Sequence, residues 1–392
     1  MFERAIYDTL LESLRQFPVA VLTGPRQSGK TTLLKQLQHD TYDYINLEFP
    51  DVLARLQSDP RGTLIHNRTK PLIIDESQKY PELFSYIQGI VDENKKKGEF
   101  ILSGSQNFLL NEKITQSLSG RARILELLPL TYSEFLTHAK SSEISIWEWL
   151  FTGAYPRPYQ DNIPVNVWSE SYIRTYLERD VRDLLNVKDL GVFQRFLKSC
   201  AARHAQILNT NQLAIDCGVS HTTIINWIHV LEASYIVFRV QPYHANFRKR
   251  LVKSPKLYFY DAGLVCHLLN IESSEHLSIH PNRGYIFEGF AMSEIYKNFA
   301  NQGKSKPLYY WRDSYGNEID CLIEHSGKLT VIEVKSSMTL MPSLVKGLNK
   351  WKEISELSSA RYVLVYAGLG DQKPLQGVDV FSWNEIGRML FG

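Results

Sequence analysis

The feature that most constrains the fold is an apolar run that leads into a glycine-rich loop near the start of the chain. Residues 19–37 read VAVLTGPRQSGKTTLLKQL, which is a strand pattern, a loop that fits G-x-x-x-x-G-K-T, and a helical pattern. In such a loop, the backbone amides and the amino end of the following helix cradle phosphate groups. The sequence therefore predicts a nucleotide-binding loop between a buried strand and a helix.

The expected nucleotide contacts share this loop and the start of the helix: Gly24, Pro25, Arg26, Gln27, Ser28, Gly29, Lys30, Thr31 and Thr32. The Lys30 ammonium would neutralise the β- and γ-phosphates, and the Thr31 hydroxyl would coordinate Mg²⁺. ATP and Mg²⁺ are therefore the expected cofactors.

A second apolar run, KPLIIDES at residues 70–77, ends in two acids. This pattern is typical of a buried parallel strand that opens onto a nucleotide, and it resembles a Walker B motif. We expect Asp75 to hold the Mg²⁺ through water. Glu76 would orient or deprotonate the attacking water, which makes it the expected catalytic base.

Two further segments belong to the same predicted domain. Residues 99–106, EFILSGSQ, read as a strand whose polar end offers Ser105 and Gln106 as sensors of the γ-phosphate, and a plain turn is the alternative. Phosphoryl transfer needs a cation near the developing charge, so Arg121 is the candidate arginine finger and Arg123 the second choice. A finger that acts on a neighbouring subunit would require a homo-oligomer, and an ordinary surface arginine is the alternative.

Residues 210–240 carry a helix-turn-helix pattern that is followed by an alternating strand. A turn at Gly218 separates a first helix, capped by Thr210 or Asn211, from a second helix capped by Ser220. This order predicts a winged helix that binds DNA, and a winged helix used only for packing is the alternative. Residues 247–256, FRKRLVKSPK, add five basic residues and no acid, which would contact phosphates or form a solvated loop. DNA is therefore the expected partner.

The C-terminal part places carboxylates at fixed points of an αβββαβ pattern. Glu333 and Lys335 are two residues apart on one predicted strand, so their side chains project from the same face, roughly 6.5 to 7 Å apart. Asp320 lies on the preceding strand of a hairpin that turns at Gly327. This pattern resembles the restriction-endonuclease-like fold of the PD-(D/E)xK nucleases.

The resemblance implies a metal-dependent nuclease site. Asp320 and Glu333 would hold a second divalent cation, Mg²⁺ or Mn²⁺, and Glu288 on the leading helix would complete the ligand set. Lys335 would be the catalytic residue that positions or activates the water. Glu318 would be an extra ligand or an exposed acid.

Nearly the whole chain resembles prokaryotic AAA+-type P-loop ATPases that carry a C-terminal domain of unknown function (4143 type). The resemblance rests on GPRQSGKTT, LIIDE, ILSGSQ, SGRARILELLPLTYSEF, YLERDV, KLYFYDAGL, GYIFEGF, YYWRD, NEIDCLI and IEVKSS. It implies ATP binding and a nuclease-like C-terminal module.

Together these patterns predict an α/β chain of three domains. Residues 1–135 would form a P-loop domain with a doubly wound parallel sheet, residues 136–275 a helical and winged-helix domain, and residues 276–392 a restriction-endonuclease-like α/β domain. The expected function is ATP binding and hydrolysis coupled to DNA binding and metal-dependent cleavage. The alternative is an ATPase switch or protein-remodelling scaffold whose C-terminal domain serves partner binding or assembly without cleavage.

The composition of the chain indicates the compartment and the kind of partner to expect. The net charge is only +2, so an anionic partner would be held by local basic patches. The four cysteines are scattered in apolar surroundings, which is typical of a reducing compartment. No segment approaches the roughly 20 apolar residues of a membrane span. We therefore expect a cytoplasmic protein with no membrane partner.

Overall fold

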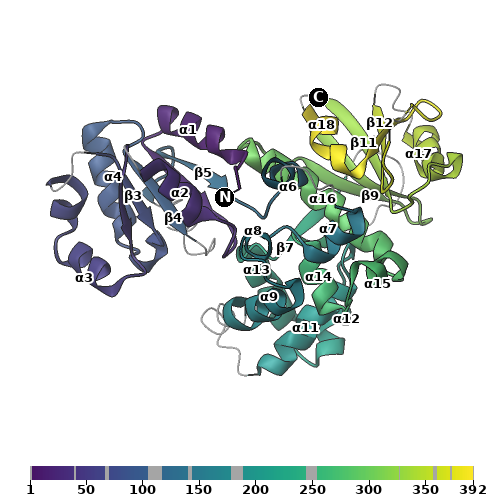
Figure 1. Ribbon diagram of the computed structural model, residues 1–392, viewed down its shortest axis with the longest axis horizontal. Coiled ribbons are helices and arrows are strands. Elements are labelled where there is room, and N and C mark those ends of the chain that lie inside the picture. Colours follow the sequence, from purple (N-terminus) through teal and green to yellow (C-terminus); the bar gives the residue numbers. More distant parts are fainter. Residues whose placement is uncertain are drawn as a thin grey trace. The chain divides into compact units, whose positions relative to one another are not determined.

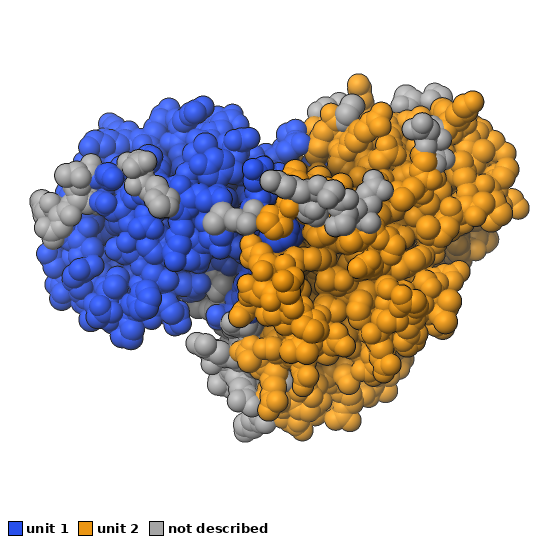
Figure 2. Space-filling model, in the orientation of Figure 1, with its two compact units in different colours: residues 1–130, 233–235, 299–304 blue, residues 131–232, 236–298, 305–392 orange. Residues whose placement is uncertain are grey.

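The structure is a computed structural model that describes residues 2–38, 41–66, 70–104, 117–139, 144–177, 189–243, 254–325, 327–355, 360–370 and 373–391. The chain folds into two compact units (Figure 2). Unit 1 holds residues 1–130, 233–235 and 299–304, and unit 2 holds residues 131–232, 236–298 and 305–392.

In its described residues, unit 1 contains a parallel sheet of five strands in the order β2-β3-β4-β1-β5. Figure 1 labels β3, β4 and β5 of this sheet together with helices α1 to α4. The strands are β1 Val19–Thr23, β2 Asp43–Asn46, β3 Leu72–Asp75, β4 Phe100–Gly104 and β5 Ala122–Glu126. The helices are α1 Ile6–Gln16, α2 Lys30–Gln38, α3 Pro50–Ser58 and α4 Leu83–Asn94, with the π-helical turn η1 Gly62–His66 and the 3₁₀ turn η2 Ser77–Lys79.

The three central strands β1, β3 and β4 are buried on both faces, because successive residues point to opposite sides and helices pack on each side. Val19 and Val21 pack in a core with side chains of α3 and α4. Ala20 and Leu22 pack in a second core with side chains of α1 and α2. The predicted α/β architecture with a parallel sheet is therefore confirmed for unit 1, and the carboxyl ends of its strands share one edge.

The described residues of unit 2 include a mixed sheet of eight strands in the order β13-β12-β11-β10-β9-β7-β8-β6. These are β6 Gln206–Ile207, β7 Val237–Pro242, β8 Lys256–Phe259, β9 Leu308–Arg312, β10 Glu318–His325, β11 Lys328–Lys335, β12 Arg361–Tyr366 and β13 Asp379–Ser382. The first half of the helices comprises α6 Tyr132–Ala139, α7 Ile146–Thr152, α8 Pro156–Gln160, α9 Val165–Tyr172, η3 Ile173–Leu177, α11 Leu190–Ala202, α12 Thr210–Cys217 and α13 His221–Ala233. The second half comprises α14 Ala262–Leu268, α15 Ser274–Ile279, α16 Arg283–Asn301, η4 Pro342–Val345, α17 Lys346–Ser355, η5 Trp383–Glu385 and α18 Ile386–Phe391.

The predicted helix, turn, helix and strand are present as α12, α13 and β7. Gly218 ends α12 in the left-handed region with φ of 68°, and the Ser220 hydroxyl accepts a hydrogen bond from Thr223 N at 3.1 Å. The cap of α12 differs from the prediction, because the Asn209 side chain accepts from Gln212 N at 3.0 Å. The use of this segment as a DNA-binding winged helix stays a prediction.

One sheet contains strands from both sides of the expected boundary at residue 275. β7, which follows the helix-turn-helix, pairs in parallel with β9 through Gln241 with Tyr309 and Pro242 with Tyr310. The division of residues 136–392 into two domains therefore stays a prediction. In the described parts of the chain, no helix is both long and apolar enough to cross a membrane.

Candidate functional site

The predicted phosphate-binding loop joins β1 to α2 in unit 1. Backbone geometry requires glycine at two positions of this loop, for a different reason at each. Gly24 has φ of 146°, and a Cβ at this position would lie 2.1 Å from the carbonyl oxygen of Leu127. Gly29 has φ of 96°, a conformation that L side chains rarely adopt. The local sequence therefore fixes the path of the loop across the carboxyl end of β1.

Lys30 folds back into this loop. Its Nζ donates to the carbonyl oxygens of Gly24 at 2.9 Å and Pro25 at 2.8 Å, and the side chain is buried. Burial lowers the pKa of Lys30 to about 8, while the carboxylates of Glu76 and Asp75 act in the opposite direction. Carbonyl oxygens only partly compensate a buried ammonium, so an anion at the loop would be stabilised.

The Asp75 carboxylate joins residues that the sequence assigned from separate motifs. Its Oδ2 accepts from the Thr31 hydroxyl at 2.7 Å and from the Tyr44 hydroxyl at 2.7 Å. Its Oδ1 accepts from the Ser103 hydroxyl and from the backbone N–H of Glu76, the latter at 3.2 Å. Asp75 is fully buried, so these hydrogen bonds fix its orientation toward the first turn of α2.

Glu76 lies immediately after β3 with φ of 55° and ψ of 42°. This left-handed conformation is uncommon for a residue other than glycine, and it turns the chain sharply at the strand end. The Gln78 amide donates to Glu76 Oε2 at 2.5 Å. The side chain of the expected catalytic base is therefore held next to Asp75 by a local turn.

Three residues of this site were not recognised from the sequence. The Arg4 guanidinium donates to the carbonyl oxygens of Ser28 at 2.6 Å and Leu128 at 2.6 Å, so it holds the loop from outside. Tyr44 and Ser103 contact Asp75 from β2 and β4. For Ser103 the usable signal is its position near the carboxyl end of β4, where polar residues of neighbouring parallel strands converge.

The expected sensor residues Ser105 and Gln106 lie outside the described residues, and their role stays a prediction. Ser103, two residues earlier on the same predicted strand, is the hydroxyl that reaches Asp75.

Arg121 lies at the opposite end of the sheet from the loop. Its carbonyl oxygen accepts from Val19 N at 3.2 Å, and Ala122 is paired with Val19, so Arg121 precedes β5 at the amino ends of the strands. Five-residue strands separate the two edges by about 15 Å. The Arg121 guanidinium forms a two-pronged ion pair with Asp92, with 2.6 Å between Nε and Oδ1 and 2.8 Å between Nη2 and Oδ2. Arg121 therefore does not line the loop of its own chain, and a role on a neighbouring subunit stays a prediction.

A second cluster of charged residues lies in unit 2. Asp320 precedes Cys321, which pairs with Ile332, so Asp320 comes opposite Glu333 on the antiparallel strands β10 and β11. The Lys335 Nζ lies 2.5 Å from Glu333 Oε1 and 3.7 Å from Asp320 Oδ2. The structure thus brings together the three residues that the strand pattern placed on one face.

The ion pair with Lys335 compensates the Glu333 carboxylate only in part. Its Oε2 is buried and has no hydrogen-bond partner in the structure. Burial, then the neighbouring Asp320, raises the pKa of Glu333 to about 8, and Lys335 opposes this shift. A Cβ on Gly347 of α17 would lie 3.0 Å from Glu333 Oε1, so this glycine lets the helix approach the carboxylate. These features fit a cation beside Asp320 and Glu333.

Glu288, the third expected ligand, is engaged elsewhere. Its Oε1 accepts from Lys256 Nζ at 2.8 Å and from the Tyr258 hydroxyl at 2.7 Å. Lys256 also forms an ion pair with Glu318. Among the described residues, no three His, Cys, Asp or Glu side chains are grouped so as to hold a metal ion. The expected ligand set is therefore not assembled, because Glu288 is paired with the Lys256 ammonium. The metal site stays a prediction.

The prediction that residues 247–256 contact phosphates or form a solvated loop is wrong for Lys256. The sequence counted it among five basic residues available to phosphates, but its side chain is only 2% exposed within β8. All four residues of this strand are buried, so Lys256 lies inside the unit, where Glu288 and Glu318 neutralise it. Residues 247–253 of the same run lie outside the described residues.

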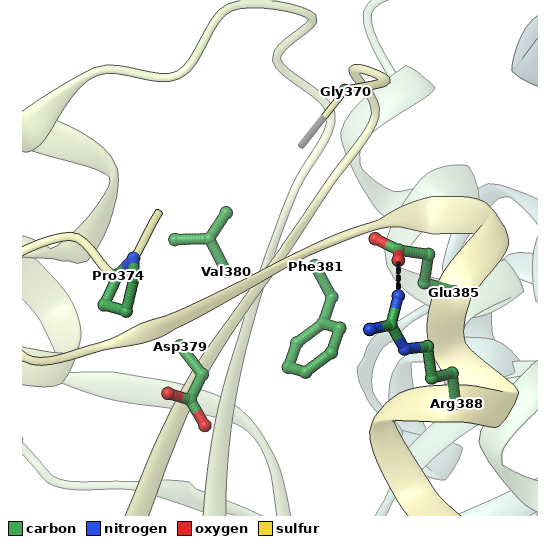
Figure 3. Close-up of a pocket in the computed structure, with 7 residues that line it drawn as sticks. All are labelled: Gly370, Pro374, Asp379, Val380, Phe381, Glu385 and Arg388. Carbon is green, nitrogen blue, oxygen red and sulfur yellow. Dashed lines mark hydrogen bonds and ion pairs between the residues drawn. The ribbon is translucent and has the colours of Figure 1, made fainter. Parts of the chain in front are cut away.

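A pocket of about 340 Å³ lies beside β13 in unit 2 (Figure 3). It is lined by Gly370, Pro374, Asp379, Val380, Phe381, Glu385 and Arg388. Arg388 donates to Glu385 at 3.0 Å and Arg361 donates to Asp379 at 2.9 Å, so each charged residue of the lining has a counter-charge. None of the predicted site residues contributes to it.

Family models match three successive parts of the chain. An AAA domain matches residues 16–136, a domain of unknown function (DUF8612) residues 143–275, and a domain of unknown function (DUF4143) residues 283–386. An uncharacterized protein of Mycobacterium tuberculosis is 32% identical over 365 residues, which cover 92% of this chain and 78% of that protein. The chain belongs to this AAA-domain family.

More distant matches span similar lengths. An uncharacterized protein of Methanocaldococcus jannaschii is 24% identical over 334 residues, which cover 78% of this chain and 72% of that protein. A solved structure, the Walker-type ATPase of Pyrococcus abyssi, aligns over 68% of this chain and 96% of its own at 15% identity, with a TM-score of 0.48.

Membership of the AAA-domain family implies ATP and usually Mg²⁺ as ligands. The residues of unit 1 fit both groups. The buried Ser28 hydroxyl in the loop has no hydrogen-bond partner, and Lys30 offers an ammonium to phosphate. The paired Thr31 hydroxyl and Asp75 carboxylate are the hard oxygen ligands that Mg²⁺ prefers.

Proposed function

We propose that this AAA-domain protein binds ATP with Mg²⁺ and hydrolyses the nucleotide at the β1–α2 loop of unit 1. The observation that carries this proposal is the 2.7 Å hydrogen bond between Thr31 and Asp75, at the base of the loop that contains Lys30. Two motifs that lie 44 residues apart in the sequence thereby meet at the corner where we propose that Mg²⁺ binds.

Each residue of this corner has a chemical task. Lys30 would contact the β- and γ-phosphates, Thr31 would hold the metal ion, and Asp75 would accept hydrogen bonds from the water around it. Mg²⁺, when bound, neutralises charge on the transferring phosphoryl group. Glu76 orients or deprotonates the attacking water, since its local turn presents a carboxylate beside Asp75.

Hydrolysis is tested by phosphate release from ATP with Mg²⁺. Glu76→Gln should keep nucleotide binding and lower turnover by about a hundredfold or more, because a general base contributes at least that much. Lys30→Ala should weaken binding and abolish turnover. Glu82→Gln is the matched control, since Glu82 is exposed at the start of α4. Unchanged turnover in Glu76→Gln would remove Glu76 as the base.

For unit 2 we propose metal-dependent action on DNA at Asp320, Glu333 and Lys335. The specific observation in favour is the position of Asp320 opposite Glu333, with Lys335 between them and one buried oxygen of Glu333 left without a partner. A cation, when bound, would supply a Lewis acid to a phosphodiester, and Lys335 would hold or orient the water.

DNA binding by the helix-turn-helix is part of this proposal. Helix α13 exposes His221, Thr222, Asn226 and His229 on one side, while Ile224, Trp227, Ile228 and Leu231 are buried on the other. An exposed polar face on the second helix is what contact with base edges in the major groove requires.

The alternative function has its own supporting observation. Lys256 neutralises Glu288 and Glu318, so part of the cluster already carries its counter-charge without a metal ion. This favours an ATPase switch or protein-remodelling scaffold that uses unit 2 for partner binding or assembly.

Incubation with linear, branched and single-stranded DNA in Mg²⁺ or Mn²⁺ separates the two functions. Cleavage by the wild type that is lost in Glu333→Gln, and kept in the exposed control Glu324→Gln, supports the nuclease. No cleavage by any of the three proteins on any substrate supports the scaffold.

A further inference from the structure

The Asp75 carboxylate has no acceptor position left. Two carboxylate oxygens offer about four lone-pair sites. The hydroxyls of Thr31 and Tyr44 donate to Oδ2, and the Ser103 hydroxyl and the Glu76 N–H donate to Oδ1. Water on a magnesium ion held by Thr31 would have to donate to the same carboxylate. One of the four present donors must therefore withdraw for that hydrogen bond to form.

Three of the four donors are either fixed next to Asp75 or needed by the metal ion. The Glu76 N–H belongs to the residue next to Asp75, and Ser103 is fully buried on β4 between β3 and β1. Thr31 is itself the expected ligand of the metal, and its hydroxyl hydrogen can stay on Asp75 while its oxygen coordinates.

Tyr44 differs from these donors in position and in burial. It lies on β2, the edge strand of the sheet, and all four residues of β2 are only partly buried. Its contact is made by the end of a long side chain, which can rotate without moving the backbone. A phenol is protonated at neutral pH, so the Tyr44 hydroxyl is the donor in its hydrogen bond to the Asp75 carboxylate.

We propose that the Tyr44 hydroxyl holds the place of a magnesium-bound water on Asp75 and leaves it when Mg²⁺ binds with nucleotide. This inference rests on the proposed ATP site. The phenol satisfies a fully buried carboxylate that would otherwise be costly to leave unpaired. The same hydrogen bond opposes the metal, so Tyr44 sets the Mg²⁺ concentration at which the site closes on nucleotide.

The test compares Tyr44→Phe with Tyr42→Phe. Both changes remove one phenol hydroxyl from the same segment, but the Tyr42 hydroxyl donates to the Gly98 carbonyl oxygen at 3.3 Å and does not touch Asp75. Calorimetric titration with ADP is carried out in EDTA and at a series of Mg²⁺ concentrations. We expect Tyr44→Phe to reach half-saturation at about three- to tenfold less Mg²⁺, since one competing hydrogen bond to a charged group is gone.

ADP affinity in EDTA should be the same in all three proteins, because Tyr44 does not contact the phosphate loop in this scheme. An equal or higher Mg²⁺ requirement in Tyr44→Phe, with Mg²⁺-dependent binding intact in the wild type, overturns the inference alone. A wild type that binds ADP neither in EDTA nor with Mg²⁺ overturns the proposed ATP site and this inference together.

Discussion

Arg4 shows how one side chain can support a binding loop that it does not belong to. Its guanidinium spans the carbonyl oxygens of Ser28 in the loop and Leu128 after β5. Charged hydrogen bonds of this kind are stronger than neutral ones, and both bonds are buried. The loop conformation therefore depends on a residue 24 positions away in the chain.

Replacing Arg4 should accordingly weaken nucleotide binding. Arg4→Ala removes both hydrogen bonds, so the loop gains freedom that binding must remove, and we expect ADP with Mg²⁺ to bind about tenfold more weakly. Calorimetry measures this on the folded protein. Arg15→Ala, on the exposed side of α1, should bind as the wild type does. Equal affinity in Arg4→Ala and Arg15→Ala would show that the loop holds its shape without Arg4.

Whether a site residue could be predicted from the sequence depends on whether it belongs to a short motif. Lys30, Thr31 and Asp75 stand in short motifs whose residues act together over a few positions, so their places could be assigned before the fold was known. Arg4, Tyr44 and Ser103 contact the same site from other elements, and no local pattern marks them.

At the scale of elements, three pieces of unit 2 meet at His204. It follows α11, its Nδ1 accepts from Phe259 N of β8 at 3.1 Å, and a Cβ on Gly289 of α16 would lie 1.7 Å from its Nε2. Burial lowers the pKa of His204 to about 3. A neutral imidazole is therefore part of the packing among these elements.

The stability of unit 2 should fall in acid for this reason. The folded-state pKa of His204 lies below the ordinary value of 6.5, so the unfolded chain binds a proton that the folded protein does not. Above pH 6.5 the imidazole is neutral in both states, so this difference does not lower the free energy of unfolding. Below pH 6.5 the free energy of unfolding falls by about 1.4 kcal/mol per pH unit, and the loss reaches about 2 kcal/mol at pH 5.

His204→Asn isolates this effect, because Asn keeps an acceptor near the Nδ1 position and does not titrate. The free energy of unfolding, measured by denaturant between pH 7 and pH 5, should decrease more in the wild type than in the variant by about 2 kcal/mol. Parallel pH profiles for the two proteins would contradict a neutral buried imidazole.

The ion pair of Lys256 gives a second prediction for elements, because it joins β8 to α16. Lys256→Met should lower the free energy of unfolding by about 3–5 kcal/mol, since it leaves Glu288 buried without its partner. Adding Glu288→Gln should recover part of the loss in a double-mutant cycle. The exposed control Lys328→Met should change stability by about 0.5 kcal/mol or less. Additive losses for the two substitutions would argue against coupling.

Sequence patterns located most of these strands and helices but not how distant ones meet. Alternating residues predicted β11, and an apolar run predicted β3, since both patterns report burial directly. The parallel pairing of β7 with β9 depends on two residue pairs between segments about 70 residues apart. Lys256 is buried because β8 lies between β7 and β6 in the sheet. Counting the basic residues of the segment could not reveal this position.

At the scale of the whole molecule, the position of Arg121 bears on whether the protein acts as a homo-oligomer. Arg121 lies at the amino ends of the strands and pairs with Asp92, so the site of the same chain receives no cation from it. A finger acting in trans would make the active form a homo-oligomer.

Mixed oligomers test this arrangement. Arg121→Ala and Lys30→Ala should each be inactive alone, but a mixture should regain part of the phosphate release, because some interfaces then join an intact loop to an intact arginine. Asp92→Asn serves as the control that frees Arg121 without removing it. A mixture as inactive as its components would place Arg121 in a structural role.

ATP hydrolysis coupled to action on DNA is the central proposal for this protein, and one assay addresses it most directly. Phosphate release by the full chain is measured with Mg²⁺, with and without linear, branched and single-stranded DNA, for the wild type and Glu76→Gln. We expect turnover in the wild type that DNA increases and that falls by about a hundredfold in Glu76→Gln. Turnover that no DNA changes, or that Glu76→Gln retains in full, would contradict the proposal.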